Sequence, residues 1–333
     1  MSYDADVETR VSHWVRDVYG ASAEVRGFRR MPGNSGFSYG FAVSACGSQE
    51  RLVLRLPPPG SNLRGVADVL HQATVLRAMR GAGVPVPEVR WSGDENPWFQ
   101  TPFFASCWVD GESTHMFDAE ADQQDGAGLE DVFRSGMRAL AAIHDVPWES
   151  VLPGWSEPRS LTTEVTRWVP TVAKSGNDDW IRRAGKVAER LEKHTPATTS
   201  LSVLHGDFYS NNWLFADGEI TAVLDWELSG IGAPGLDLGW ICMMYDTASW
   251  GPSRHMWSAW NPSDTFLVEE YLAGGGRHVD QLEWYRALSG YRLACITGRN
   301  YSLHVSGKRP DPAWDIVAES VPYLFDRADE LLS

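Results

Sequence analysis

The chain has 333 residues, 43% of them hydrophobic and 22% charged, a balance typical of a globular protein with a sizeable core. Its formal net charge of −15 argues against a nucleic-acid partner, which needs a basic surface, and fits an acidic surface or a cationic substrate. The four cysteines form no C-x-x-C pair, no apolar run approaches the roughly 20 residues of a membrane span, and no signal-peptide pattern opens the chain, so we expect a soluble cytoplasmic protein.

The N-terminal third is expected to form an antiparallel sheet with flanking helices. Helical spacing of apolar residues predicts a helix over 4–19 that ends at Gly20. Gly- and Pro-containing turns separate the strand-like segments. These segments are 24–30, 37–44, 51–56, 88–91 and 101–109, and a helix over about 64–80 interrupts them.

The chain beyond residue 110 is expected to be mainly helical. Its predicted helices are 130–146, 160–172, 178–194, 236–244, 264–273, 281–302 and 314–332. His144 is interpreted as a buried histidine with hydrogen-bond partners and not as a catalytic base. Trp and Tyr residues after position 237 are candidates for lining a substrate pocket, although each is explained as well by the core.

Three oxygen-bearing side chains are concentrated in the stretch 203–225, VLHGDFYSNNWLFADGEITAVLD. Two apolar runs joined by Asp-Gly predict a hairpin, so Asn212 and Asp225 are expected near each other at its open end, beside Asp207. Phosphoryl transfer needs oxygen ligands for Mg²⁺ and a carboxylate that orients the attacking hydroxyl. The pattern therefore predicts Asp207 as the catalytic residue and Asn212 and Asp225 as metal ligands. Local capping of the backbone by these residues explains neither the spacing nor the second carboxylate.

The motif His205-Gly206-Asp207, followed by Asn212, Asp225-Trp226 and the segment 232–238, resembles the aminoglycoside phosphotransferase family. The resemblance implies the α+β, bilobal fold of protein kinases, with a nucleotide-binding lobe over 1–109 and a helical catalytic and acceptor lobe over 110–333. It also implies that ATP, or GTP, is used with Mg²⁺ to phosphorylate a small hydroxylated molecule. His205 is expected to brace the catalytic loop, and Asp237 to be a structural acid.

The same resemblance assigns the nucleotide contacts. Ser35, Gly36 and Ser38 belong to the loop that corresponds to the phosphate-binding loop of kinases. Arg55 stands where kinases carry the lysine that holds the phosphates, and Ser106 and Trp108 fall in the segment whose main chain contacts adenine.

One position departs from the family pattern. Gln72 occupies the place of the glutamate that pairs with the phosphate-holding cation in kinases. A neutral amide can accept a hydrogen bond from Arg55 but cannot form an ion pair with it. The partner of Arg55 is therefore left open, and a catalytically silent kinase homologue is one alternative.

Two kinds of active kinase are compatible with the motifs. The first phosphorylates an aminoglycoside or another small hydroxylated compound. The second phosphorylates a hydroxyacyl thioester or another metabolite, and the sequence VLRLPPPG at residues 53–60 resembles the branch associated with acyl-CoA dehydrogenases. The acceptor depends on the variable helices and not on the fold.

Overall fold

The computed structural model describes residues 3–31, 37–94, 96–114, 126–197, 200–254 and 260–333. The chain groups into two units. The first, here called the sheet unit, comprises Met1–Gly111, Glu149–Trp155 and Thr221–Ser229, and the second, the helical unit, comprises Glu112–Trp148, Ser156–Ile220 and Gly230–Ser333. Within the described ranges, no helix has both the length and the apolar character needed to cross a membrane.

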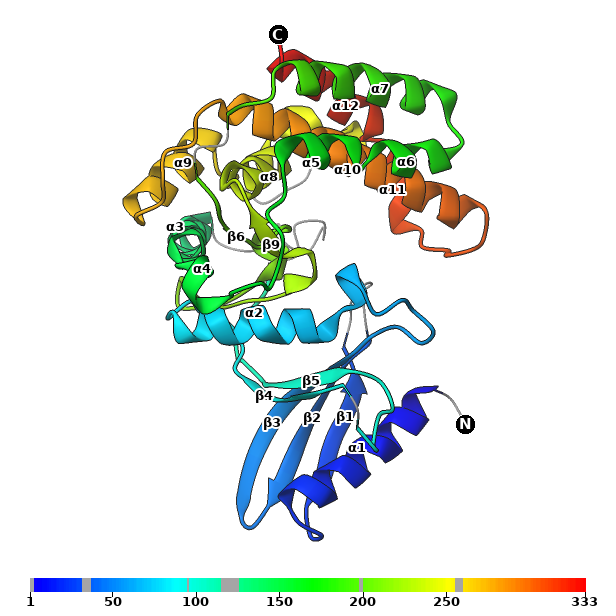
Figure 1. Cartoon of the computed structure of the whole chain (residues 1–333), viewed down its shortest axis with the longest axis vertical. Helices are drawn as coiled ribbons and strands as arrows, with labels where there is room; N and C mark the ends of the chain where they lie inside the picture. Colours follow the sequence, from blue (N-terminus) through cyan, green and yellow to red (C-terminus); the bar gives the residue numbers. More distant parts are fainter. Residues whose placement is uncertain (1–2, 32–36, 95, 115–125, 198–199, 255–259) are drawn as a thin grey trace. The chain divides into compact units, whose positions relative to one another are not determined.

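The sheet unit contains a five-stranded antiparallel sheet in the order β1-β2-β3-β5-β4 (Figure 1). Its strands are β1 (Glu24–Arg30), β2 (Phe37–Ala45), β3 (Ser48–Leu56), β4 (Val89–Gly93) and β5 (Phe103–Cys107). Helix α1 (Tyr3–Tyr19) packs its apolar side on one face, where Trp14 lies edge-on against Phe41 in the core. Alternation along the strands therefore leaves the other face to the polar positions.

Helix α2 (Val69–Gly81) begins five residues later than the sequence predicts. The side chain of Asp68 accepts a hydrogen bond from the main-chain N–H of His71 and so caps the helix there. The preceding residues Gly65–Ala67 form a separate 3-10 turn. The predicted helix start near residue 64 is wrong, because the cap at Asp68 was not recognised.

The rest of the chain is mainly helical, as predicted. Its described helices are α3 (Gly126–Asp145), α4 (Trp148–Val151), α5 (Leu161–Thr166), α6 (Val169–Val172), α7 (Asp178–Lys193), α8 (Gly235–Tyr245), α9 (Asp264–Ala273), α10 (Leu282–Val305), α11 (Ala313–Ala318) and α12 (Val321–Leu331). Helix α10 packs against both α8 and α12 (Figure 1). The segments 160–172 and 314–332 each form two helices and not one, because α6 and α12 restart at a proline in their first turn.

Two short antiparallel pairs frame the central stretch. Strands β6 (Ser202–Leu204) and β9 (Gly230–Gly232) pair with each other, and β7 (Trp213–Ala216) pairs with β8 (Glu219–Val223). The predicted Asp-Gly hairpin is thus present, with both turn residues at positive φ. The predicted α+β class, with an antiparallel N-terminal sheet and a helical C-terminal part, is confirmed.

Candidate active site

The segment after β6 is anchored by a buried carboxylate on α8. Asp237 accepts hydrogen bonds from the main-chain N–H groups of His205, at 2.7 Å, and Gly206, at 2.8 Å. Gly206 has φ 86°, a conformation that favours glycine over other residues. The pairing of β6 with β9, which leads directly into α8, holds the loop and the carboxylate in register.

Asp237 also ends a buried chain of hydrogen bonds. Nε2 of His144 lies 3.3 Å from the Asp237 carboxylate, and Nδ1 of His144 lies 2.8 Å from the hydroxyl of Tyr271. Burial raises the pKa of Tyr271 to about 12, so this phenol stays protonated and donates to His144. The histidine then carries its proton on Nε2 and donates it to Asp237, as expected for a satisfied core histidine.

The electrostatics of this chain keep Asp237 ionised. Burial alone would raise the pKa of its carboxyl, but the hydrogen bond from His144, the nearby imidazoles of His144 and His205, and the Gly206 N–H outweigh burial. The pKa of Asp237 is therefore lowered from its ordinary value. A fixed negative charge consequently holds the start of the loop.

Asp207 and Asn212 are brought together in the helical unit. The side-chain amide of Asn212 donates to the main-chain oxygen of Asp207 at 2.8 Å and to its carboxylate at 3.2 Å. The main-chain N–H of Asp207 donates to Nδ1 of His205 at 3.2 Å. The hydrogen bonds with Asn212 and His205 orient the Asp207 carboxylate. Because Asn212 uses its amide N–H group in these contacts, its amide oxygen is available as a metal ligand.

In the sheet unit, Arg55 of β3 meets two carboxylates from the Asp225-Trp226-Glu227 segment. Its guanidinium donates to Glu227 at 2.9 Å and to the hydroxyl of Ser38 at 2.9 Å, and it lies 3.7 Å from the carboxylate of Asp225. All three side chains of Arg55, Glu227 and Asp225 are at least partly buried. A guanidinium in this setting is held in place and keeps its charge.

The contacts of Gln72 and Glu227 identify the carboxylate that pairs with Arg55. Gln72 is buried, and its side-chain amide donates a hydrogen bond to the main-chain oxygen of Val66 at 3.2 Å, six residues earlier in the chain. The carboxylate that pairs with Arg55 is Glu227, which the sequence interpretation did not assign. The partner of Arg55, which the sequence left open, is therefore an acid two residues after Asp225.

Asp225 has two features of a ligand-binding residue. It adopts φ 60° and ψ 62°, a left-handed conformation that is uncommon for residues other than glycine. Its Oδ1 atom is buried and has no hydrogen-bond partner among the described residues. A buried carboxylate oxygen without a donor fits a cation such as Mg²⁺, which binds one or two protein oxygens together with phosphate oxygens.

The described residues contain no cluster of three or more His, Cys, Asp and Glu side chains that could hold a metal ion by themselves.

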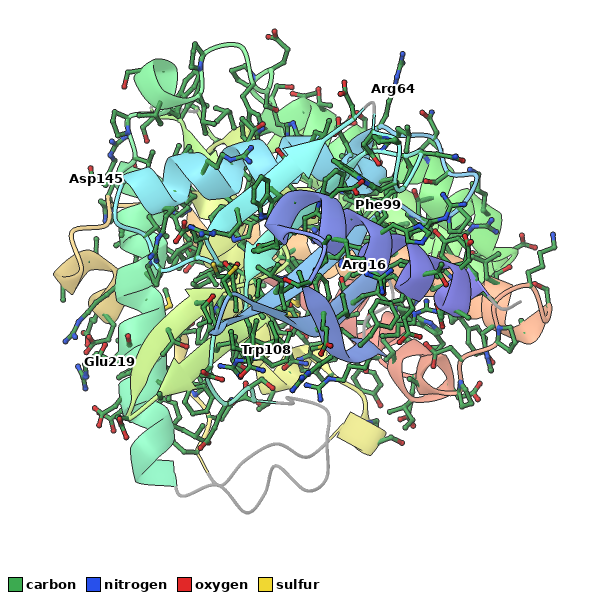
Figure 2. All side chains as sticks on the ribbon, turned by 90° about the horizontal axis from the view of Figure 1, so that it is seen from below. Arg16, Arg64, Phe99, Trp108, Asp145 and Glu219 are labelled. Carbon is green, nitrogen blue, oxygen red and sulfur yellow. The ribbon has the colours of Figure 1, made fainter. Side chains whose placement is uncertain are left out.

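The sheet face opposite α1 carries the remaining predicted nucleotide contacts. Ser38 pairs with Arg55 across β2 and β3, and Ser106 of β5 pairs with Val53, so these side chains share that face. Trp108, labelled in Figure 2, lies against Gly40, where an added Cβ would come within 3.0 Å of the indole. Ser35 and Gly36 lie outside the described residues.

The main chain near Trp108 is already partly engaged. The N–H of Cys107 donates to Glu88 at 2.8 Å and that of Trp108 donates to Arg51 at 2.9 Å. The contact of this segment with adenine stays a prediction.

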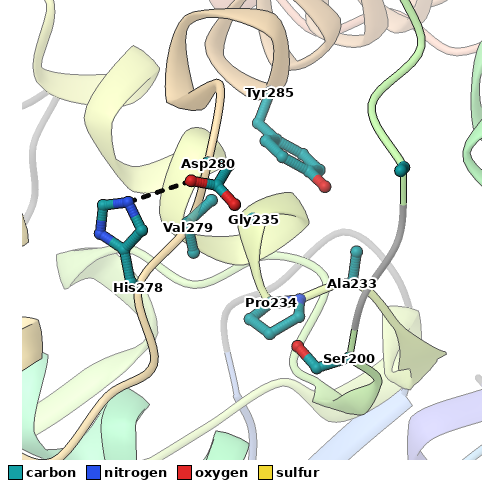
Figure 3. A pocket seen from close by; sticks show the side chains of 9 residues that line it. Ser200, Ala233, Pro234, Gly235, His278, Val279, Asp280 and Tyr285 are labelled. Atoms are coloured by element: carbon teal, nitrogen blue, oxygen red, sulfur yellow. Dashed lines mark ion pairs between the residues drawn. The ribbon is translucent and has the colours of Figure 1, made fainter.

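A separate pocket in the helical unit lies beside the start of α8, between the segment Ala233–Gly235 and the segment His278–Asp280 (Figure 3). Its only ion pair among the described side chains joins His278 to Asp280, and both are about three-quarters exposed, at 76% and 77%. The residues that line it do not include any from the loop 205–212. We assign it no role in the chemistry of Asp207.

Comparison with known proteins identifies relatives of about three-quarters of the chain. The profile of the phosphotransferase enzyme family matches residues 32–286. Acyl-CoA dehydrogenase family member 10 of Mus musculus is 25% identical over 272 residues, which cover 78% of this chain and 25% of that protein. Family member 11 of Homo sapiens is 26% identical over 266 residues, which cover 77% of this chain and 34% of that protein. The chain thus spans a quarter to a third of the length of these two relatives.

Solved structures share the fold at lower sequence identity. A provisionally assigned aminoglycoside phosphotransferase from Ralstonia eutropha superposes with a TM-score of 0.78 at 20% identity, covering 97% of this chain and 98% of the other. A mutant of aminoglycoside phosphotransferase APH(4)-Ia, in complex with AMP-PNP and hygromycin B, gives 0.60 at 16% identity, covering 97% and 98%. These likenesses support the kinase-like fold and carry no information about the acceptor.

Proposed function

Because this chain belongs to the phosphotransferase enzyme family, we propose that it transfers the γ-phosphoryl group of Mg-ATP to a hydroxyl group of a small organic molecule. The observation that carries the proposal is the arrangement of the loop 205–212, in which Asn212 and His205 orient the carboxylate of Asp207. The use of ATP is supported by the AMP-PNP complex of the similar fold.

Each residue has one role in the proposed reaction. The acceptor hydroxyl donates its proton to Asp207 while its oxygen forms a bond to the γ-phosphorus and the bond from that phosphorus to the bridging oxygen breaks, which releases ADP. Asn212 and Asp225 would hold Mg²⁺, which when bound neutralises charge on the phosphates. Arg55 would hold a phosphate oxygen and is itself positioned by Glu227.

The experiment that tests the proposal is transfer of label from γ-³²P-ATP to a panel of alcohols, with product separated from inorganic phosphate. Labelled product with any acceptor, and none without enzyme, supports it. If the protein binds Mg-ATP but neither phosphorylates any alcohol of a wide panel nor slowly hydrolyses ATP, it is a nucleotide-binding protein without catalytic activity. That alternative has lost part of its motivation, because Glu227 supplies the acid that Gln72 lacks.

Replacing Asp225 with Asn is expected to weaken binding of Mg-ATP by about tenfold or more, since an amide is a poorer Mg²⁺ ligand than a carboxylate. Binding measured by calorimetry with Mg²⁺ and with EDTA checks this result. In the wild type, EDTA should weaken binding strongly, whereas in the variant it should have little further effect. An unchanged affinity for Mg-ATP would remove Asp225 from the metal site.

Replacing Arg55 with Gln is expected to raise the KM for ATP by roughly tenfold, because the charged hydrogen bond from the guanidinium to a phosphate oxygen is lost. Arg55→Lys should recover only part of this effect, since an ammonium cannot reproduce the forked contacts with Ser38 and Glu227. Initial rates against ATP concentration measure both. Equal KM values in all three proteins would show that Arg55 does not reach the nucleotide.

A metabolite kinase is favoured over a drug-modifying enzyme by one observation. The curated relatives are named acyl-CoA dehydrogenase family members, and this chain matches a quarter to a third of their length. A hydroxyacyl thioester is therefore a second candidate acceptor, beside aminoglycoside-like compounds. Including both classes in the acceptor panel distinguishes them.

A further inference from the structure

Helix α8 contacts the loop 205–212 at two points. The first is Asp237, near the start of the helix, which holds the main-chain N–H groups of His205 and Gly206. The second is Tyr245, the last residue of the helix, which contacts Ser210 in the middle of the loop. Positions eight residues apart lie on nearly the same side of a helix, so α8 presents both side chains to one segment.

The hydroxyl of Tyr245 makes two hydrogen bonds with Ser210. It donates to Oγ of Ser210 at 2.6 Å and accepts from the main-chain N–H of the same residue at 3.4 Å. Both residues are buried. Burial raises the pKa of the Tyr245 phenol, which therefore stays protonated and able to donate. Removing the hydroxyl would take this acceptor from a buried N–H group, and such a loss is costly.

Tyr245 is itself held firmly at the end of α8. Its ring packs edge-on against Phe133 of α3, with 4.8 Å between the ring centres. The carboxylate of the next residue, Asp246, accepts at 2.8 Å from Arg286 of α10 and at 2.8 Å from Arg327 of α12. Contacts with α3, α10 and α12 thus fix the phenol from which the loop hangs.

Ser210 begins the short turn that carries Asn212. Residues 210–212 form a 3-10 turn, and the main-chain N–H of Trp213 donates to the oxygen of Ser210 at its end. From this turn the side-chain amide of Asn212 reaches the main-chain oxygen and the carboxylate of Asp207. A displacement of Ser210 is therefore passed over two residues to the side chain assigned to Mg²⁺.

We propose that Tyr245 is a positioning residue, whose hydroxyl fixes Ser210 and thereby holds the amide oxygen of Asn212 in place to bind Mg²⁺. The inference rests on the proposed function, in which Mg²⁺ arrives with ATP. Tyr245 acts through Ser210 and is given no contact with the nucleotide or the acceptor. The buried end of α8 thus contributes to metal binding from outside the motif residues.

The variant Tyr245→Phe keeps the ring and removes only the hydroxyl. Binding of ATP is measured by calorimetry with Mg²⁺ and with EDTA, well below the melting temperature of each protein. The affinity gained on adding Mg²⁺ should be about fivefold smaller in the variant than in wild type, because one buried hydrogen bond that orients the ligand is lost. Affinity in EDTA should stay within about twofold of wild type. An unchanged gain from Mg²⁺ would reduce Tyr245 to a purely structural role and overturn the proposal.

Tyr291 of α10 provides a matched control. It is also buried, and its hydroxyl donates to the main-chain oxygen of Val165 in α5 at 3.2 Å. Tyr291→Phe should lower the thermal midpoint by a few degrees, as Tyr245→Phe does, but should keep the full gain in affinity from Mg²⁺. If both variants lost that gain equally, the effect would come from general loosening of the helical unit and the proposal would be wrong.

A second variant tests the same hydrogen bond from its other side. Ser210→Ala removes the oxygen to which Tyr245 donates but keeps the main-chain contact, so the gain from Mg²⁺ should fall by about threefold. The double variant should bind no more weakly than Tyr245→Phe, because both changes delete one interaction. Effects that multiply would contradict the proposal. If Tyr245→Phe fails to fold, an unchanged gain in Ser210→Ala overturns the proposal by itself.

Hydrogen exchange of the nucleotide-free protein provides a readout independent of transfer. The main-chain N–H groups of Asn212 and Trp213 are hydrogen-bonded in the loop. Peptides covering 205–213 should exchange about fivefold faster in Tyr245→Phe than in wild type, and at the wild-type rate in Tyr291→Phe. Equal exchange in all three proteins would reject the role of Tyr245. If Mg²⁺ does not raise the affinity of wild type for ATP, the proposed function fails. A gain in wild type that Tyr245→Phe shares in full rejects only the inference about Tyr245.

Discussion

The variant Asp207→Asn is expected to lose phosphoryl transfer almost completely, with kcat lowered by about 10²–10⁴-fold. The substitution keeps the size of the side chain and one oxygen that can still accept from the amide of Asn212. It removes the carboxylate that receives the hydroxyl proton. Nucleotide affinity should remain within about twofold of wild type, since Asp207 has no assigned contact with ATP. Initial rates and calorimetric binding of Mg-ATP measure the two quantities separately.

A matched control is available in the same unit. Asp280→Asn also removes one negative charge, at an exposed site paired only with the exposed His278 among the described side chains, and should retain full kcat. If Asp207→Asn kept more than a tenth of the wild-type kcat, the proton acceptor would have to be another group. If nucleotide affinity fell in parallel with kcat, the assignment of Asp207 to the acceptor side would be wrong.

The sequence predicted most elements because their patterns are local. The helix α1, the strands of the sheet and the Asp-Gly hairpin each follow from apolar periodicity and turn residues within one short segment. The predicted family is confirmed by the profile that matches residues 32–286, and the curated relatives named acyl-CoA dehydrogenase family members 10 and 11 are 25% and 26% identical to this chain. The boundaries of α2, α6 and α12 were missed, where a cap or a proline decides the start of a helix.

The interactions that span long distances in the sequence could not be predicted. Arg55 and Glu227 are separated by 172 positions, and nothing in either segment identifies the other as its partner. The Asp225-Trp226-Glu227 segment offered one signal, a second acid close to the predicted ligand. Arg292 lies in the long helix α10, and only the fold shows that it contacts Gly206. The convergence of Asp207, Asn212 and Asp225 on one Mg²⁺ stays a prediction.

The variant Asp237→Asn is expected to lower the free energy of unfolding by about 1–3 kcal/mol, the range for leaving buried hydrogen-bonding groups without a partner. Asp237 is fully buried and accepts from His205, Gly206 and His144, so all of its partners are donors. An asparagine has one oxygen and one amide nitrogen, and the nitrogen would face an N–H group with no acceptor between them. Urea unfolding at neutral pH, with the slope of the transition compared, measures the effect.

The pair formed by Asp315 and His304 provides a control with the same separation. Nε2 of His304 lies 3.3 Å from the carboxylate of Asp315, as Nε2 of His144 does from Asp237, but the Asp315 side chain is 59% exposed. Solvent screens an exposed pair, so Asp315→Asn should change the free energy of unfolding by less than about 1 kcal/mol. Similar losses in both variants would mean that burial of Asp237 does not determine its contribution.

The acid dependence of stability gives the same prediction a second measurement. The pKa of Asp237 is lowered in the folded chain, so the unfolded chain takes up the proton first as pH falls. The contribution of this carboxylate is therefore fully present above its unfolded pKa of about 4 and is lost as pH falls through the lower folded value. Wild type should lose stability more steeply below about pH 4 than Asp237→Asn, which has no proton to bind at this position. Parallel curves for the two proteins over that range would show that Asp237 is not held ionised by His144 and the loop.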